Sequence, residues 1–376
     1  MTRGLDCDVA VIGGGVVGLA SAAALAAAGR SVCLLERFTG LGREASSRNS
    51  GVIHAGLHYP PDSLKARLCV EGRERLYAHC AQLGLPHRRT GKWVVAVEET
   101  EIASLEAMEQ RGRACGAGAL EWVDGASLAR RAPGVCGVAA LHSPETGLVD
   151  APALCLSLAA EAESAGAQIA LGREVRGIEP AAAGYRLTLR AADDSRDALH
   201  CAAVVNAAGL GADRVAEAAG LDVDARGYRH HPCRGDYFAL VSGAPLSVEV
   251  PVYPVPAGPG LGIHATPDLA GRVCFGPDAR YVDDPADLRV DAARATAFAE
   301  AARRYLPALR PEWLSPDQAG VRARLAAPGE AFRDFVVAEE SEAGLPGFVN
   351  CLGIESPGLT ASLAIGARVS ELLASL

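Results

Sequence analysis

The sequence predicts an α/β fold (α+β overall), in which a nucleotide-binding domain built on a parallel sheet is interrupted by a β-rich domain. Residues 1–37 carry apolar and glycine-rich segments in the order strand, turn, helix, strand. Residues 346–376 return to that pattern, whereas the proline- and glycine-rich segment from about 227 to 328 predicts short strands and one helix. A chain of 376 residues is long enough for two domains, or for one large domain with an insertion.

The first strand, helix and second strand form a candidate dinucleotide-binding unit. An apolar run at residues 9–12 predicts the first strand, and the alanine-rich stretch at about 17–28 predicts the helix. The second strand ends at Glu36, where a carboxylate would accept hydrogen bonds from the ribose hydroxyls of a dinucleotide. An alanine-rich core helix after a glycine turn would leave Glu36 unexplained. The complete unit therefore predicts dinucleotide binding.

The turn between strand and helix is a G-x-G-x-x-G pattern made by Gly13, Gly15 and Gly18. Gly13 permits the tight turn, Gly15 lets the backbone approach a pyrophosphate, and Gly18 lets the helix pack closely on the strand. The helix N-terminus offers N–H groups and a positive dipole end to the anion. We expect further cofactor contacts from the residues beside these elements, namely Val16, Val17 and Arg37.

Composition excludes several functional classes. Hydrophobic residues at 49% and charged residues at 22% are typical of a globular protein, and a net charge of −9 argues against nucleic acid as a partner. Eleven scattered cysteines show no C-x-x-C motif or metal-ligand spacing, so we expect no metal and reduced thiols in a reducing compartment. Neither a signal peptide nor a membrane span is predicted. We therefore expect a cytoplasmic protein, with peripheral contact to the cytoplasmic membrane face left open.

The middle of the chain alternates helical and strand patterns. Residues 199–209 form an apolar run that ends in small residues, and Ala208 and Gly209 would let a cofactor lie against the backbone. Before it, the patterns predict helices at 61–84, 101–116 and 152–166, strands at 91–99 and 167–172, and a hairpin of 174–180 with 185–190.

The C-terminal segment decides which dinucleotide is expected. In a nicotinamide dehydrogenase the nucleotide-binding unit is normally continuous, whereas in glutathione-reductase-like flavoproteins the last strand and helix return to the flavin. Gly353, Gly358 and Leu359 would place a helix N-terminus at the flavin's pyrimidine edge, although an ordinary helix covering the sheet is the alternative. Together with the first unit, this predicts a glutathione-reductase-like FAD-binding Rossmann domain with an inserted β-rich substrate domain. The expected boundaries are 1–85, 145–225 and 329–376 for the FAD-binding domain, and 86–144 and 226–328 for the substrate domain.

Residues 46–72 (SSRNSGVIHAGLHYPPDSLKARLCVEG) are more specific than the glycine pattern. Here the sequence resembles the L-2-hydroxyglutarate dehydrogenase/oxidase family within the D-amino-acid-oxidase superfamily of FAD enzymes. Further similar strings follow in order, namely RGDYF (234–238), VYPVP (252–256), LGIHATPDLAGRVCFGPDA (261–279), AGVRA (319–323), RDFVV (333–337) and GIESPGLTASLAIG (353–366). The resemblance covers nearly the whole chain. It implies non-covalent FAD and oxidation of a 2-hydroxy dicarboxylate to its 2-oxo acid.

Two histidines are candidates for the proton transfer that such an oxidation needs. Hydride leaves the α-carbon for flavin N5 while the hydroxyl proton is removed, and a neutral imidazole suits the second step. His54 follows the loop expected to run along the flavin and is the candidate base. His264 is the second candidate, as a base or as a hydrogen-bond donor to the substrate.

The two substrate carboxylates would need cationic or hydroxyl partners. The candidates are Lys65, Arg234, Tyr253, Arg322, Arg324 and Thr360. Side chains and backbone of the 46–51 loop are expected at the pyrophosphate or flavin, and Val175 at the adenine; with Thr360, the additional cofactor candidates are Ser46, Ser47, Asn49, Ser50, Gly51 and Val175. Cys351 is expected to be a buried thiol and not a covalent flavin attachment. The short glycine-rich loop 256–261 could shift substrate preference if it lines the pocket mouth.

Three other functions compete with an L-2-hydroxy-acid dehydrogenase. An amine or amino-acid oxidase of the same superfamily, acting on glycine or sarcosine, would not need His54 as a base for a hydroxyl proton. A flavin-bearing scaffold protein would show no substrate-dependent bleaching, and an NAD-dependent dehydrogenase would be colourless. The electron acceptor is left open between a quinone, an electron-transfer protein and oxygen.

Overall fold

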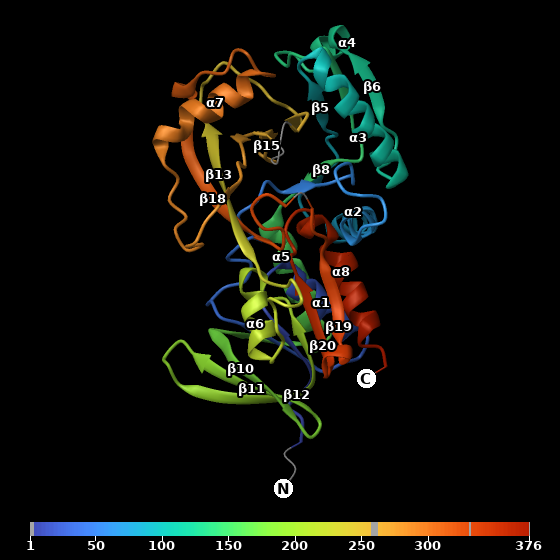
Figure 1. The fold of residues 1–376 in the computed structure, drawn as a ribbon, viewed down its shortest axis with the longest axis vertical. Helices are drawn as coiled ribbons and strands as arrows, with labels where there is room; N and C mark the ends of the chain where they lie inside the picture. Colours follow the sequence, from blue (N-terminus) through green and yellow to red (C-terminus); the bar gives the residue numbers. More distant parts are fainter. Residues whose placement is uncertain (1–3, 257–261, 331, 376) are drawn as a thin grey trace.

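The computed structural model describes residues 4–256, 262–330 and 332–375 (Figure 1). In it, two large sheets lie at opposite ends of an elongated molecule, with most of the long helices between them. The loop expected to influence substrate preference falls almost wholly at 257–261, outside the described residues.

The first sheet contains eight described strands and is parallel at its centre. β1 pairs in parallel with β2 and β12, β12 with β20, and β2 with β9, while the hairpin β10–β11 extends the sheet antiparallel from β12. Its strands are β1 (Cys7–Ile12), β2 (Val32–Glu36), β9 (Gln168–Leu171), β10 (Arg173–Ala181), β11 (Gly184–Ala191), β12 (Arg196–Asn206), β19 (Val336–Glu340) and β20 (Leu345–Leu352). The predicted strand–helix–strand unit, the hairpin and the C-terminal return are confirmed.

Apolar helices cover one face of this sheet and form the main core. α1 (Val16–Ala27) packs against both α5 (Ala151–Ser164) and α8 (Gly358–Leu372), and α8 also packs against α2 (Leu64–Leu83). The opposite face packs against α6 (Ala212–Ala218). Because the sheet is covered on both sides, its central strands are almost continuously apolar, as parallel strands usually are.

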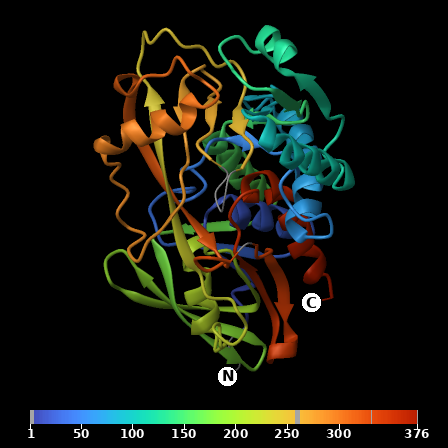
Figure 2. The same ribbon diagram turned by 45° about the horizontal axis from the view of Figure 1, so that its top comes forward.

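The second sheet contains nine described strands from two separate parts of the chain. Its order is β17-β13-β16-β15-β14-β5-β7-β6, with β18 paired to β13. The strands are β5 (Trp93–Ala96), β6 (Glu121–Asp124), β7 (Ala139–His142), β13 (His231–Leu240), β14 (Val252–Pro254), β15 (Ala265–Pro267), β16 (Val273–Phe275), β17 (Arg280–Tyr281) and β18 (Leu314–Arg324). Both ribbon views place α7 (Ala295–Arg303) beside β13 and β18, and α3 (Ile102–Ala114) and α4 (Gly125–Arg131) at the other side (Figures 1 and 2).

The expectation of only short strands in the 227–328 segment is wrong for β13 and β18. These strands have 10 and 11 residues and pair with each other along most of their length. The prolines and glycines of the segment lie mainly in the loops between strands, so composition averaged over the segment concealed a long antiparallel pair.

A small third sheet lies between the two large ones (Figure 1). It consists of β3 (Val52–Ile53), β8 (Gly147–Val149) and β4 (His87–Arg88). Short 3₁₀ helices occupy Glu99–Glu101, Gly209–Gly211, Ala292–Arg294, Pro311–Trp313 and Ser341–Ala343. The first sheet takes its strands from residues before 37, between 168 and 206 and after 335, and the second from 93–142 and 231–324. The domain boundaries themselves stay a prediction.

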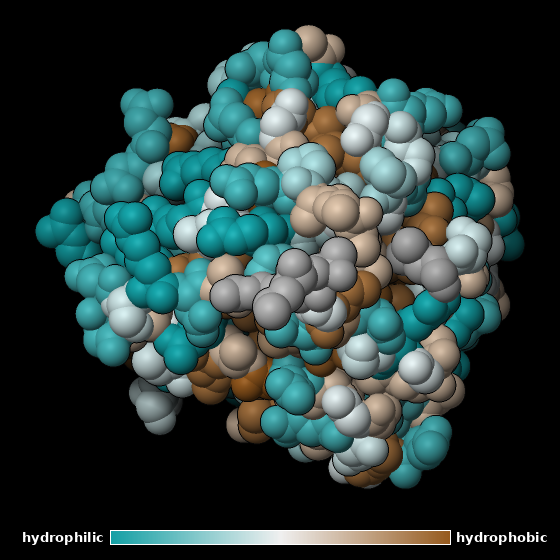
Figure 3. Space-filling model, turned by 90° about the horizontal axis from the view of Figure 1, so that it is seen from below, coloured by the Kyte–Doolittle hydropathy of each residue, from teal (hydrophilic) through white to brown (hydrophobic). Residues whose placement is uncertain are grey.

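Seen from below, hydrophilic side chains cover most of the surface and hydrophobic ones appear in small groups among them (Figure 3). Within the described ranges, no helix combines the length and hydropathy that crossing a membrane requires.

Candidate active site

The glycine turn brings β1, α1 and β12 into close contact. A Cβ on Gly18 would lie 1.9 Å from the carbonyl oxygen of Gly13, and one on Gly13 would lie 2.4 Å from that of Ala207. Gly13 also has φ +109°, which favours glycine. Gly15 is the N-cap of α1 and has no side chain to cap it; the N–H of Val16 donates to Ser46 Oγ, and the N–H groups after it in the first turn are left for an anion.

Glu36 shapes this turn from the end of β2. Its two carboxylate oxygens accept hydrogen bonds from the backbone N–H groups of Gly14 (2.6 Å) and Phe38 (2.7 Å), and the residue is 7% exposed. Each oxygen has a second lone pair for a further donor. The carboxylate is therefore held in place at the edge where the sequence predicts a ribose.

The 46–51 loop packs against the first turn of α1. Ser46 Oγ accepts the N–H of Val16 at 2.9 Å. Asn49 folds onto its own loop, because its amide donates to two backbone carbonyls and its Oδ1 accepts the N–H of Gly51. Ser50 Oγ donates to the hydroxyl of Tyr237 at 3.3 Å, which links the loop to β13. The polar side chains predicted to contact a cofactor therefore also form hydrogen bonds that hold this loop in place.

The remaining predicted cofactor residues lie in or next to strands of the first sheet and the helices that cover it. Arg37 forms an exposed ion pair with Glu44 at 2.6 Å, and Ser47 donates to the carbonyl of the same residue. Val175 adjoins an irregularity in the pairing of β10 with β11. Of the others, Ala208 and Gly209 follow β12, Gly353 follows β20, Gly358 and Leu359 begin α8, and Val17 lies in α1.

His54 lies directly after β3 and is held by α8. Its backbone N–H donates to Thr360 Oγ1 at 3.0 Å, and that hydroxyl donates in turn to the carbonyl of Val52. Its Nε2 lies 3.3 Å from Ser356 Oγ, which also lies 3.3 Å from the hydroxyl of Tyr59. Its Nδ1 is buried and has no hydrogen-bond partner among the described residues. Thr360 thus positions His54 and does not present a free hydroxyl.

Burial and a nearby cation keep the His54 imidazole neutral. Burial first, and then the charge of Lys92, lower the pKa of His54 to about 3. The same two causes lower the pKa of His58 well below its usual value. A neutral imidazole at neutral pH retains a lone pair that can accept a proton.

Facing these histidines, the ends of three strands of the second sheet bring Lys92, Tyr253 and His264 together. The rings of Tyr253 and His264 stack with centroids 3.4 Å apart and an interplanar angle of 8°. Lys92 Nζ lies 4.4 Å from the centroid of the Tyr253 ring and 3.5 Å from His58 Nε2. The two predicted residues Tyr253 and His264 are thereby connected to the histidines that follow β3.

Two predicted carboxylate-binding cations share one acidic partner. Lys65 Nζ lies 2.9 Å from Glu355 Oε1 and also donates to the carbonyl of Arg333. Arg324 Nε lies 3.4 Å from Glu355 Oε2. Glu355 directly precedes Ser356, so this group borders the His54 cluster, but its charges already compensate each other in part.

The other two predicted cations lie on β13 and β18 and bind groups of the protein. Arg234 donates through Nε to Asp236 at 2.7 Å and through its other nitrogens to the carbonyls of Asp287 and Arg289. Arg322 donates to the carbonyl of Asp278 at 2.6 Å and to Cys233 Sγ. The structure does not bring Arg234 to the His54 cluster, and its contacts are those of a structural residue.

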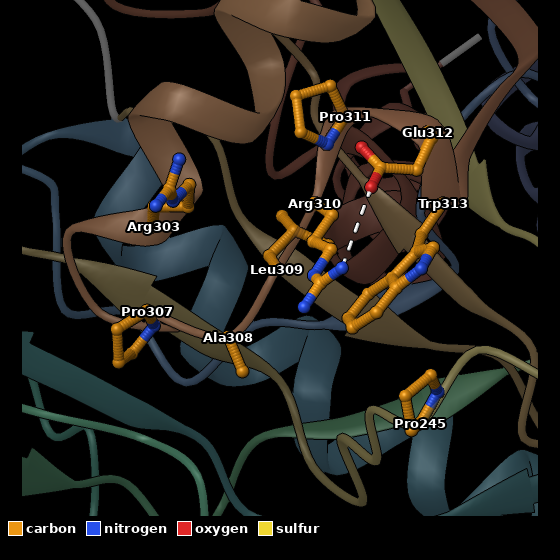
Figure 4. A pocket seen from close by; sticks show the side chains of 9 residues that line it. All are labelled: Pro245, Arg303, Pro307, Ala308, Leu309, Arg310, Pro311, Glu312 and Trp313. Atoms are coloured by element: carbon orange, nitrogen blue, oxygen red, sulfur yellow. Dashed lines mark ion pairs between the residues drawn. The ribbon is translucent and has the colours of Figure 1, made fainter.

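One surface hollow lies elsewhere. It has a volume of about 590 Å³, and the side chains around it include the ion pair of Arg310 with Glu312, 4.0 Å apart (Figure 4). A second hollow of about 190 Å³ contains His231 and Arg333. Neither hollow is lined by a predicted site residue, so we place the site by its chemistry. Within the described part of the chain, no group of three or more His, Cys, Asp or Glu side chains is arranged to hold a metal ion.

Sequence reasoning missed Lys92, His58, Tyr59 and Ser356. Three of them lie inside quoted family-like strings, His58 and Tyr59 just after His54 and Ser356 just before α8. The rarity of lysine could have drawn attention to Lys92, because only two of the 36 lysine and arginine residues in the sequence are lysines.

Comparisons with known proteins show which family the chain belongs to. The family described as FAD dependent oxidoreductase matches residues 8–372. The mitochondrial L-2-hydroxyglutarate dehydrogenase of Arabidopsis thaliana is 37% identical over 402 residues, covering 97% of this chain and 83% of that protein. The human mitochondrial L-2-hydroxyglutarate dehydrogenase is 37% identical over 283 residues, covering 72% of this chain and 60% of that protein.

Solved structures show the same fold. Dithionite-reduced L-α-glycerophosphate oxidase from Mycoplasma pneumoniae, with FAD bound, superposes with a TM-score of 0.86 at 27% identity, covering 98% of this chain and 94% of that one. Glycine oxidase from Geobacillus kaustophilus superposes with a TM-score of 0.82 at 23% identity, covering 98% and 95% of the two chains. The second likeness is one of fold alone.

Proposed function

The chain belongs to the FAD-dependent oxidoreductase family, together with the L-2-hydroxyglutarate dehydrogenases, and from this premise we propose that it oxidises L-2-hydroxyglutarate to 2-oxoglutarate. The observation that supports this reaction most directly is His54, a half-buried imidazole with a strongly lowered pKa beside the N-terminus of α8. Oxidation of a hydroxy acid needs a group that accepts the hydroxyl proton. An amine that binds in its neutral form has no such requirement.

The described residues fit FAD. The contact of Gly18 with Gly13 has no room for a side chain, the first turn of α1 offers N–H groups, and a Cβ on Gly209 would meet nothing within 4 Å. Burial raises the pKa of the Cys351 thiol to about 12, which opposes thiolate chemistry and agrees with non-covalent binding. When bound, FAD supplies the two-electron acceptor for hydride from the substrate α-carbon, at N5.

We propose that His54 accepts the substrate hydroxyl proton at Nε2. The Ser356 hydroxyl occupies this position at 3.3 Å, whereas Nδ1 is buried. A substrate hydroxyl that replaces Ser356 as the donor would meet the same lone pair. Thr360 fixes the backbone of His54 to α8 and so holds the ring in place for this transfer.

The remaining groups would orient the substrate. His264, stacked on Tyr253, is proposed as a hydrogen-bond donor, and Arg324 on β18, 3.4 Å from Glu355, as a positive charge for a substrate carboxylate. The first sheet would then act as the FAD-binding domain and the second as the wall of the substrate pocket.

The proposal is tested with purified, FAD-loaded protein under anaerobic conditions. L-2-hydroxyglutarate should bleach the flavin absorption band, whereas glycine and sarcosine should leave it oxidised. Bleaching by glycine or sarcosine with no response to the hydroxy acid would identify an amine oxidase instead.

A further inference from the structure

Lys92 is an unusual residue in this chain. Of 36 lysine and arginine residues only Lys65 and Lys92 are lysines, and both are buried, at 4% and 1% exposure. Lysine is a compact charge whose pKa changes readily on burial, whereas arginine stays protonated. Lys65 has Glu355 as its counter-ion.

Lys92 has no carboxylate within 4.0 Å among the described residues. Its Nζ lies 3.5 Å from His58 Nε2 and faces the Tyr253 ring at 4.4 Å, while its backbone pairs with Ser143. Burying an ammonium group without a counter-ion is costly, so the residue calls for an anion that the described part of the chain does not supply.

We propose that Lys92 is the residue that binds a carboxylate of the substrate. This inference rests on the proposed function, because it takes the anion to be the 2-hydroxy dicarboxylate that His54 deprotonates. The arrangement supports it, since Lys92 Nζ, the two histidines after β3 and the stacked Tyr253–His264 pair lie together. Of the four cations predicted for this task, Lys65, Arg234 and Arg322 already donate to acidic or carbonyl groups of the protein. Arg324 lies 3.4 Å from Glu355, without a hydrogen bond from its buried Nε.

Substrate binding at Lys92 would also help the base. The charge of Lys92 lowers the pKa of His54, after burial itself, and so opposes formation of the imidazolium ion. A carboxylate bound to Lys92 compensates that charge, which raises the proton affinity of His54 when the hydroxyl proton must be accepted. Free protein and substrate complex would thus differ in the basicity of the same imidazole.

The test uses glutarate, a dicarboxylate that lacks the reacting hydroxyl, and measures its affinity from the perturbation of the flavin absorption spectrum. Lys92→Met should bind glutarate about 10- to 100-fold more weakly than wild type, the range for a hydrogen bond to a charged group. Arg310→Met removes the same charge from a side chain that is 65% exposed, and it should bind glutarate like wild type. Unchanged affinity in Lys92→Met would overturn the inference.

The pH dependence provides a second readout. Burial lowers the pKa of Lys92 to about 8, so glutarate affinity of wild type should fall as pH rises through that value. The other titratable and charged groups that face this region are His54, His58, His264, Tyr59, Tyr253, Cys69, Arg73 and Arg111. Lys92→Arg should lose the decline, because guanidinium stays protonated. If the decline persists in Lys92→Arg, another of these groups causes it and the inference is wrong.

The two proposals fail differently. If L-2-hydroxyglutarate does not reduce the wild-type flavin and glutarate does not bind, both proposals are wrong. If wild type is reduced and binds glutarate while Lys92→Met binds it equally well, only the role of Lys92 is wrong.

Discussion

At the residue scale, His54 depends on its neighbours for its properties. Thr360 Oγ1 accepts a hydrogen bond from the His54 backbone N–H, and Ser356 Oγ contacts His54 Nε2. The positive charge of Lys92 lowers the pKa of the imidazole. An exposed histidine titrates near pH 6.5 and would be partly protonated at neutral pH. Burial and Lys92 remove that partial charge, so the ring is in the form that accepts a proton.

Replacing His54 by Gln should slow anaerobic flavin reduction by L-2-hydroxyglutarate about 10²- to 10⁴-fold, the usual contribution of a general base. Glutamine retains polarity but cannot take the proton. Stopped-flow absorbance measures the rate, and FAD content should stay that of wild type. His79→Gln is the matched control, because that ring contacts Ser157 on α5, away from the cluster. A near-normal rate in His54→Gln would exclude it as the base.

The sequence indicates which residues could take part in the chemistry better than it indicates which groups those residues contact. His54, His264 and Tyr253 follow from the chemistry and the family-like strings, and the structure brings their surroundings together. Arg234 forms an ion pair with Asp236, which lies two residues along the same strand and therefore on the same face. Its other partners, the carbonyls of Asp287 and Arg289, are more than 50 residues away, and the sequence does not show that they bind this guanidinium.

At the element scale, the site exists because separate elements end at the same place. His54 directly follows β3, α8 contributes the Thr360 hydroxyl that holds it, and Lys92 directly precedes β5. The strand–helix–strand unit and the C-terminal return were predictable, because glycine spacing and helical periodicity are local signals. The pairing of β5 with β14 could not be predicted in this way, because it joins segments about 160 residues apart in the sequence.

Gly18→Ala tests the contact on which the nucleotide-binding turn depends. Its Cβ would lie 1.9 Å from the Gly13 oxygen, so β1 and α1 must separate. We expect a loss of about 1–3 kcal/mol in the free energy of unfolding, as in other overpacked sites, and weaker FAD retention. Urea unfolding and flavin content after gel filtration measure the two effects.

The matched control for this change is Gly211→Ala. A Cβ at Gly211 would meet nothing within 4 Å, and its backbone conformation does not require glycine. Its stability and flavin content should equal those of wild type. Wild-type stability and FAD retention in Gly18→Ala would show that the turn tolerates a side chain and would contradict the packing argument.

At the scale of the whole molecule, a buried charge network stabilises the second sheet. Asp236 is fully buried on β13 and forms ion pairs with Arg234, Arg280 and Arg294. Burial alone would raise the pKa of Asp236, but its hydrogen bonds with Arg234 and Arg280 lower it overall. The network connects β13 to β17 and to the segment before α7.

The lowered pKa of Asp236 fixes the direction of its pH effect. Its stabilising contribution is present above the unfolded-state pKa of about 3.9 and is lost as pH falls through the lower folded-state value. Asp236→Asn should lower the unfolding free energy at pH 7 by about 3–5 kcal/mol, because it leaves Arg234 buried without its partner. Urea unfolding from pH 7 down to pH 3 should show the difference from wild type shrinking with acidification.

A surface carboxylate provides the comparison for that network. Asp194→Asn changes a side chain that is 84% exposed and should alter stability by less than about 0.5 kcal/mol. An Asp236→Asn protein as stable as wild type at pH 7 would mean that the three arginines do not need this carboxylate.

The most direct test of the proposed function compares the two enantiomers of 2-hydroxyglutarate under anaerobic conditions. The account predicts that the L form reduces the FAD of the wild-type protein and yields one 2-oxoglutarate per flavin reduced, while the D form leaves the flavin oxidised. Equal reduction by both enantiomers, or no reduction by the L form, would contradict it.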